Sequence, residues 1–119
     1  MFQIPESALE KNEGLFKFTD KNGKEWALPL SKYLRADEGE RLGECAVELA
    51  NAAQMREKTE KERNAKAERT VNAQLKLARV QREILDKYCP GLYATLHSDQ
   101  VGALMTAWQE ASGADAMGE

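Results

Sequence analysis

The alternation of apolar and polar positions near the start of the chain predicts a β-hairpin over residues 15–30. In the first run, Phe16 and Phe18 flank a lysine. Asp20-Lys21-Asn22-Gly23 follows, and a second alternating run comes after it. Period-two alternation is typical of strands, and Asn-Gly tolerates the positive φ of a tight turn. Pro29 cannot donate to a strand ladder and ends the second strand. Since a two-strand ribbon is marginal alone, we expect its aromatic face to rest on the helices that follow.

Helical periodicity then extends over residues 38–88. Apolar residues at helical spacing occupy its first part (Leu42, Ala46, Val47, Leu49, Ala50 and Ala53) and its last part (Val71, Leu75, Leu77, Ala78, Val80, Ile84, Leu85 and Tyr88). The charged middle, residues 54–70, has high helix propensity but almost nothing to bury. About fifty residues of unbroken helix would span roughly 75 Å, against a radius of gyration of about 13–14 Å for a compact domain of this size. We therefore predict two helices, or one long helix supported by another copy.

A final amphipathic helix is predicted over residues 98–112. Cys89-Pro90-Gly91 ends the long helical region, because proline blocks continuation and glycine allows a C-terminal turn. The small, acidic residues 113–119 are predicted to form a disordered tail. The expected fold is therefore mainly α, with an N-terminal β-hairpin, in a single domain of residues 1–119.

The only histidine, His97, is followed directly by Ser98 and Asp99, which are the residue types of a hydrolase triad. Adjacent residues seldom reach the geometry that a nucleophile, its base and an orienting acid require. A serine followed by an acid in the first turn is instead typical of a helix N-cap. No phosphate loop, dinucleotide fingerprint or H-E-x-x-H motif is present. We therefore expect a chain that is not an enzyme and has no cofactor.

Composition narrows the classes of partner. The net charge is −3, with nine basic and six acidic residues over residues 45–85 and one basic and five acidic residues over 86–119. This balance argues against nucleic-acid binding. No run of 18 apolar residues exists, and the N-terminus lacks the layout of a signal peptide, so we expect no membrane partner. Cys45 and Cys89 are predicted to be free, buried thiols, and their spacing from His97 is not that of a zinc site.

Large apolar side chains near the C-terminus are the best candidates for a partner-binding surface. They form a patch before the final helix and one face of that helix: Leu92, Tyr93, Leu96, Val101, Leu104, Met105 and Trp108. At helical spacing such a face closes a protein's own core or holds a partner's apolar helix, and both interpretations stay open here.

The two ends of the chain resemble the tail assembly chaperones of long-tailed bacteriophages (siphophages) of Gram-positive hosts. The resemblance is carried by FKFTDKNGKEWALPLSKYL, which leads through Leu28-Pro29-Leu30 to Tyr33-Leu34, and by PGLYATLHSDQVGALMTAWQEAS. In the second stretch the matching residues are Leu96, Ser98, Asp99, Gln100, Leu104, Trp108 and Ser112.

The resemblance implies a non-enzymatic role in the cytoplasm of the bacterial host cell. Such chaperones bind the long tape measure protein and keep it soluble while the tail tube assembles. Their genes often yield a longer, frameshifted product, which would be a second partner, and a homo-oligomer is also left open. The alternative function is a small structural or oligomeric adaptor of a phage particle, without chaperone activity.

Overall fold

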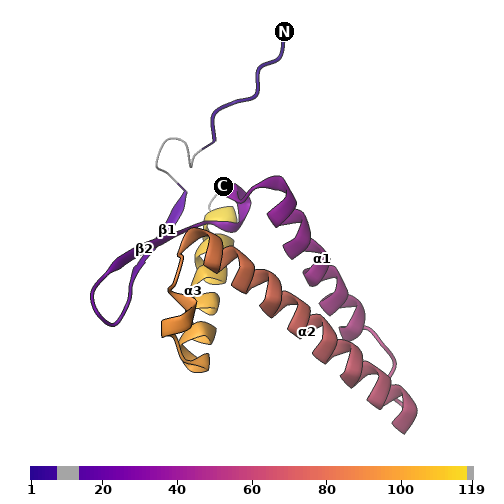
Figure 1. The fold of residues 1–119 in the computed structure, drawn as a ribbon. Helices are drawn as coiled ribbons and strands as arrows, with labels where there is room; N and C mark the ends of the chain where they lie inside the picture. The colour runs from indigo at the N-terminus through magenta and orange to yellow at the C-terminus, as the bar shows by residue number, and fades with distance from the viewer. Residues whose placement is uncertain (8–13, 118–119) are drawn as a thin grey trace. The chain divides into compact units, whose positions relative to one another are not determined.

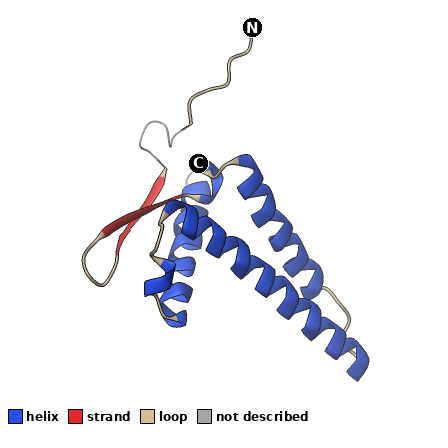
Figure 2. Ribbon diagram, in the orientation of Figure 1, coloured by secondary structure: helices blue, strands red, loops and turns tan. Residues whose placement is uncertain are grey.

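The fold is mainly helical with an N-terminal antiparallel hairpin, as the sequence predicts (Figure 1, Figure 2). The computed structural model describes the backbone of residues 1–7 and 14–117, and side chains up to residue 113. Its elements are β1 (Leu15–Thr19), β2 (Glu25–Pro29), the 3-10 turn η2 (Ser31–Tyr33), α1 (Ala36–Ala53), α2 (Glu60–Tyr88), the 3-10 turn η3 (Tyr93–Thr95) and α3 (Ser98–Met117).

Contacts divide the chain into two compact units where the sequence predicts a single domain. The terminal unit comprises Met1–Arg35 and Leu85–Glu119 and contains the β-hairpin. The hairpin unit comprises Ala36–Ile84 and is named for its two helices, α1 and the first part of α2. The division falls within α2, whose apolar pattern continues across it, so helical periodicity gives no signal at this point.

The β-hairpin turn of the terminal unit is closed by one carboxylate. Asp20 Oδ1 accepts the backbone N–H groups of Asn22 at 2.9 Å and Lys24 at 3.0 Å, while Gly23 adopts a φ of 81°. The indole N–H of Trp26 donates to Asp20 Oδ2 at 3.1 Å. This bond, with the two backbone N–H groups, lowers the pKa of Asp20 below its ordinary value. The turn is therefore held by side-chain bonds as well as by the predicted backbone conformation.

Trp108 of α3 anchors the core of the terminal unit. Only 2% of its surface is exposed, and its Nε1–H donates to the carbonyl oxygen of Pro29 at 2.8 Å. One turn further along α3, the Ser112 hydroxyl oxygen accepts the backbone N–H of Ser31 at 3.0 Å. The Cys89 thiol donates to the carbonyl of Ala27 at 3.4 Å. These bonds fix α3 and the end of α2 to β2 and to the η2 turn that follows it.

The hairpin unit consists of α1 and the first part of α2, which run antiparallel (Figure 1). Arg41 pairs with Glu83, and Lys76 Nζ lies 2.8 Å from Glu48 Oε1. The buried residues between the two helices are mostly small: Cys45, Ala52, Ala73, Val80 and Ile84. Small side chains allow the helices to approach closely, but they leave this unit with a thin core.

The predicted helical region 38–88 breaks at residues 54–59, so the first of the two predicted alternatives, two separate helices, is the one observed. The cause is a reciprocal capping box at the start of α2. The Thr59 hydroxyl oxygen accepts the N–H of Glu62 at 3.1 Å, and Glu62 Oε1 accepts the N–H of Thr59 at 3.0 Å. The N–H of Arg63 donates to the carbonyl of Thr59 at 2.9 Å, which makes Thr59 the N-cap. Glu57 then lies in the loop and pairs with Lys66 at 3.3 Å.

This capping box gives a direct prediction. Thr59→Ala removes the acceptor for the N–H of Glu62, and we expect it to lower the free energy of unfolding by about 1 kcal/mol. Thr59→Ser keeps the acceptor and is expected to stay within about 0.5 kcal/mol of the wild type. Urea unfolding followed by far-UV circular dichroism measures both. Equal losses in the two variants would contradict a capping role.

α3 begins at Ser98 as predicted, but its N-cap and its C-terminal end differ from the predicted ones. The N–H of Val101 donates to the carbonyl of His97 at 3.0 Å, so His97 is the N-cap and Ser98 is already the first helical residue. The prediction that Ser98 caps the helix is therefore wrong by one position. Gln100, the third helical residue, reaches back with Oε1 to accept the N–H of His97 at 2.8 Å, as in one half of a capping box. At its other end, α3 continues to Met117 instead of stopping at residue 112, so the predicted tail is helical over 113–117. Residues 118–119 of that tail lie outside the described residues.

The predictions for the two cysteines and for the end of the long helical region are confirmed. Cys45 and Cys89 are free and buried, and burial raises the pKa of each thiol above its ordinary value. The long helical region ends at Tyr88, and Gly91 follows with a φ of 84°. The N–H of Leu92 donates to the carbonyl of Cys89 at 3.1 Å, which closes the turn around Pro90.

Candidate binding groove

A mostly apolar groove of about 340 Å³ lies in the terminal unit. Its walls come from three segments distant in sequence: β1 and its turn, the segment before α3, and one side of α3. The lining residues are Phe16, Phe18, Thr19, Asp20, Lys21, Leu92, Leu96, Gln100, Ala103, Leu104 and Ala107. Below, "the apolar groove" means this set.

Strand pairing and helical spacing explain why these side chains meet. Phe16 and Phe18 are two residues apart on β1 and therefore share one face, where their rings stack with centroids 5.6 Å apart. On α3, Gln100, Leu104 and Ala107 are separated by four and three residues and therefore share one side of the helix. The aromatic pair of β1 and these α3 side chains thus line the groove together.

The structure separates the seven predicted partner-binding residues into three groups. Leu92, Met105 and Trp108 are buried, with exposed fractions of 2%, 7% and 2%. Leu96 and Leu104 are half-buried and line the groove, where Leu92 also contributes to the wall. Tyr93 and Val101 are half-buried but do not line it. On the face of α3, Met105 and Trp108 therefore close the core, and Leu104 borders the groove.

The aromatic side chains of the β-hairpin were not among the predicted partner-binding residues. Phe16 and Phe18 form one wall, and Ala103 and Ala107 widen the groove on the α3 side. The available signal was the aromatic face of the predicted β-hairpin, which had to pack against a helix. The alanines carry no signal of their own, because an exposed alanine on a helix is ordinary.

Polar groups of the groove gather around the β-hairpin turn and the start of α3. Asp20 is held by its bonds to the turn and to Trp26, and Lys21 beside it is exposed. Gln100 uses its amide oxygen to accept the backbone N–H of His97. A ligand in the groove would therefore meet apolar walls and a few polar groups, which suits an amphipathic segment.

The residues of the suspected triad act as the start of a helix. His97, Ser98 and Asp99 are all exposed. His97 caps α3, and Asp99 Oδ1 accepts the backbone N–H of Gln100 at 3.0 Å. The backbone of His97 and the carboxylate of Asp99 thus take part in the first turn of α3.

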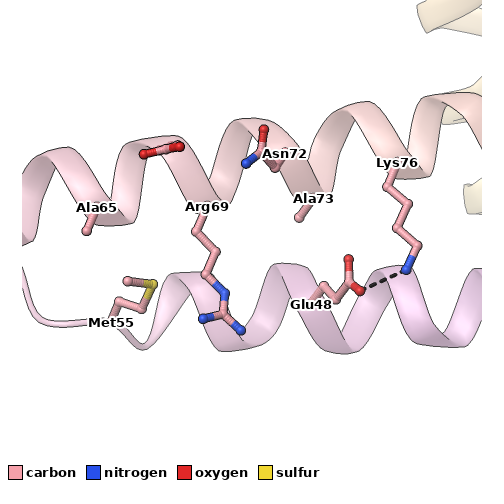
Figure 3. A pocket seen from close by; sticks show the side chains of 8 residues that line it. Glu48, Met55, Ala65, Arg69, Asn72, Ala73 and Lys76 are labelled. Atoms are coloured by element: carbon pink, nitrogen blue, oxygen red, sulfur yellow. Dashed lines mark hydrogen bonds and ion pairs between the residues drawn. The ribbon is translucent and has the colours of Figure 1, made fainter.

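The hairpin unit carries a larger hollow, of about 580 Å³, between α1 and α2 (Figure 3). Ala65 and Ala73 leave space there, and Lys76 reaches across it to Glu48. Charged side chains form much of this wall, which suits an apolar segment less well than the apolar groove does. In the part of the chain that the structure describes, no group of His, Cys, Asp and Glu side chains could hold a metal ion.

Comparisons with known proteins returned no match to a family model, to a curated protein or to a solved structure. Within residues 1–7 and 14–117, no helix has both the length and the apolar character needed to cross a membrane.

Proposed function

We propose that this protein is a non-enzymatic tail assembly chaperone of a bacteriophage, which binds apolar helical segments of the tape measure protein in the apolar groove. The single observation that carries this proposal is the groove itself, with Leu96, Leu104 and the Phe16–Phe18 pair on its walls. The place of action is the cytoplasm of the bacterial host cell.

The form of the groove supports a helical ligand. Its walls are apolar or small, and buried Leu92 supports them from the core. An amphipathic helix presents apolar side chains at positions i, i+3, i+4 and i+7, which fit such a groove, while its polar back stays in water. No catalytic constellation is needed for this role, since binding alone keeps an apolar segment from self-association.

The identity of the client comes from the resemblance of both chain ends to tail assembly chaperones. The stretches that carry the resemblance overlap the groove: FKFTDK contains the aromatic wall, and LHSDQVGALMTAW contains the α3 wall. A tape measure protein is long and helical, so many copies of a small chaperone can cover it. Binding to such segments shifts the client toward its soluble form by mass action.

Co-expression with the tape measure protein of the same phage tests the proposal. We expect the soluble fraction of the tape measure protein to rise several-fold when this chain is present. We also expect the two proteins to co-purify. An unchanged soluble fraction, at equal expression, would overturn the proposal.

A structural or oligomeric adaptor of the particle is the second candidate function. It is favoured by apolar side chains that the hairpin unit leaves exposed, namely Val47, Val71 and Leu75. The two functions differ in where the protein ends up: a chaperone is absent from finished virions, and an adaptor is present in them at a fixed copy number. Mass spectrometry of purified virions distinguishes them.

A further inference from the structure

We infer that the hairpin unit associates head-to-tail with the hairpin units of other copies, through the outer faces of α1 and α2. The α1 outer face is defined as Gly43, Val47 and Ala50, and the α2 outer face as Val71, Leu75 and Ala78. This association uses neither wall of the apolar groove and does not depend on the proposed chaperone function.

Both outer faces are apolar and lie opposite the buried seam of the hairpin. On α1 the buried positions are Cys45 and Ala52, so Val47 points away from α2 and is 59% exposed. On α2 the buried positions are Ala73 and Val80, so Leu75 points away from α1 and is 57% exposed, like Val71 at 51%. Each helix thus carries a second apolar face with the same spacing of four and three residues, which the chain itself does not cover.

The opposite net charges of the two helices favour a second copy of this chain as the occupant. α1 contains five acidic residues and one basic residue. The part of α2 that belongs to the hairpin unit contains four acidic and seven basic residues. The α1 face of one copy therefore complements the α2 face of another, whereas two α1 faces or two α2 faces would bring like charges together.

A neighbouring copy can dock in the same antiparallel register that α1 and α2 have within one chain. Within one chain, Arg41 lies beside Glu83 and Glu48 beside Lys76. If α1 of the next copy docks on α2 in the same antiparallel register, its Glu44 comes level with Arg79. Helical spacing places both of these side chains on the side of the layer that carries the Lys76–Glu48 pair.

The apolar contacts of this register are complementary in shape. Val47 of the incoming helix would lie between Leu75 and Ala78, and Gly43 would let the helices approach closely. A side chain added at Gly43 would meet no atom of its own chain within 4 Å, so nothing within the chain requires a glycine there. Glycine in a helix interior costs about 1 kcal/mol relative to alanine, and close packing against a second copy gives this one a use.

The expected association is weak and open-ended. The contact is one helix wide and about 27 Å long for the 18 residues of α1, which is small compared with stable dimer interfaces. Each copy uses two different faces, so addition of a copy leaves one face free at each end. The average mass is therefore expected to rise steadily with concentration.

Complementation between two blocked variants tests this arrangement by sedimentation velocity. Val47→Glu blocks the α1 face, and Leu75→Glu blocks the α2 face. We expect each variant alone to be monomeric at concentrations where the wild type self-associates, and an equimolar mixture to form dimers that do not grow further. Self-association of either variant alone, or a mixture that stays monomeric, would overturn the inference, as would a wild type that is monomeric throughout.

A second test exchanges the charges of Glu44 and Arg79, which adds no charge to an apolar face. Glu44→Arg and Arg79→Glu are each expected to raise the apparent dissociation constant about tenfold, and the double variant to recover most of the loss. Thr106→Glu, on the exposed surface of α3, is the control for added charge and should associate as the wild type does. Far-UV circular dichroism confirms that every variant is folded, and a double variant that associates no better than the single ones would contradict the pairing.

Discussion

Replacement of Trp108 by alanine is expected to lower the free energy of unfolding by about 3–5 kcal/mol. The indole is 2% exposed in the core of the terminal unit, and its N–H is bonded to the carbonyl of Pro29 at 2.8 Å. The variant loses the buried ring, leaves a cavity and leaves the carbonyl oxygen of Pro29 without this donor. Urea unfolding followed by far-UV circular dichroism measures the loss. Since small domains have about 5–15 kcal/mol in total, partial unfolding at 37 °C is expected.

Two matched variants separate the contributions at this position. Trp108→Phe keeps an aromatic ring and loses the bond to Pro29, so a loss of about 1–2 kcal/mol is expected. Trp26→Ala removes the other tryptophan, which is half-buried beside the β-hairpin turn, and should cost clearly less than Trp108→Ala. Equal losses for the two alanine variants would show that Trp108 is not the centre of the core.

Leu104→Asp is expected to weaken binding of a tape measure segment by about 30-fold or more, which corresponds to about 2 kcal/mol or more. Leu104 borders the apolar groove on α3, and a carboxylate there would have to lose its water when an apolar helix docks. The side chain is only half-buried in the free protein, so the fold tolerates the change better than it tolerates a change at Trp108. Titration of a fluorescently labelled amphipathic peptide from the tape measure protein, followed by anisotropy, measures the affinity.

The control for this substitution lies two residues further along the same helix. Thr106 is exposed and does not line the groove, so Thr106→Asp adds the same charge outside the site. Its affinity is expected to stay within about twofold of the wild type, since isolated surface charges contribute little. Similar losses for Thr106→Asp and Leu104→Asp would indicate general repulsion of the peptide, and the groove would no longer explain binding.

Local chemistry made the β-hairpin and the ends of the long helical region predictable. Alternation at Phe16 and Phe18, the Asn22-Gly23 pair and the proline at position 29 all indicated one hairpin, which the structure confirms. Cys89-Pro90-Gly91 likewise ends α2 as expected. In each case the residues that determine the conformation are neighbours in the sequence, so the signal is complete within a short window.

The break in the helical region and the end of α3 were harder to predict, because propensity and capping favour different structures there. Residues 54–59 all have helix-compatible side chains, yet the reciprocal bonds of Thr59 and Glu62 start a new helix. At the other end, the helix predicted to stop at residue 112 continues through Gly113 to Met117. A single glycine weakens a helix without ending it when the following residues are helix formers such as alanine.

The groove could be predicted only in part, since its walls come together through tertiary packing. Helical spacing put Leu104 and Trp108 on one face but could not tell which side chain is covered by β2 and which is left at the groove. That distinction depends on the bond from Trp108 to Pro29, between residues 79 positions apart. The contribution of Phe16 and Phe18 depends in the same way on how α3 packs against β1.

Site-specific photo-crosslinking in cells that co-express the tape measure protein tests the central claim most directly. A photoreactive amino acid is placed at Ala103, which is exposed and lines the groove, or at Thr106, which is exposed on the same helix outside it. The groove account predicts a crosslink to the tape measure protein from position 103 and little or none from position 106. Equal crosslinking from the two positions, or none from position 103 while the tape measure protein stays soluble, would contradict it.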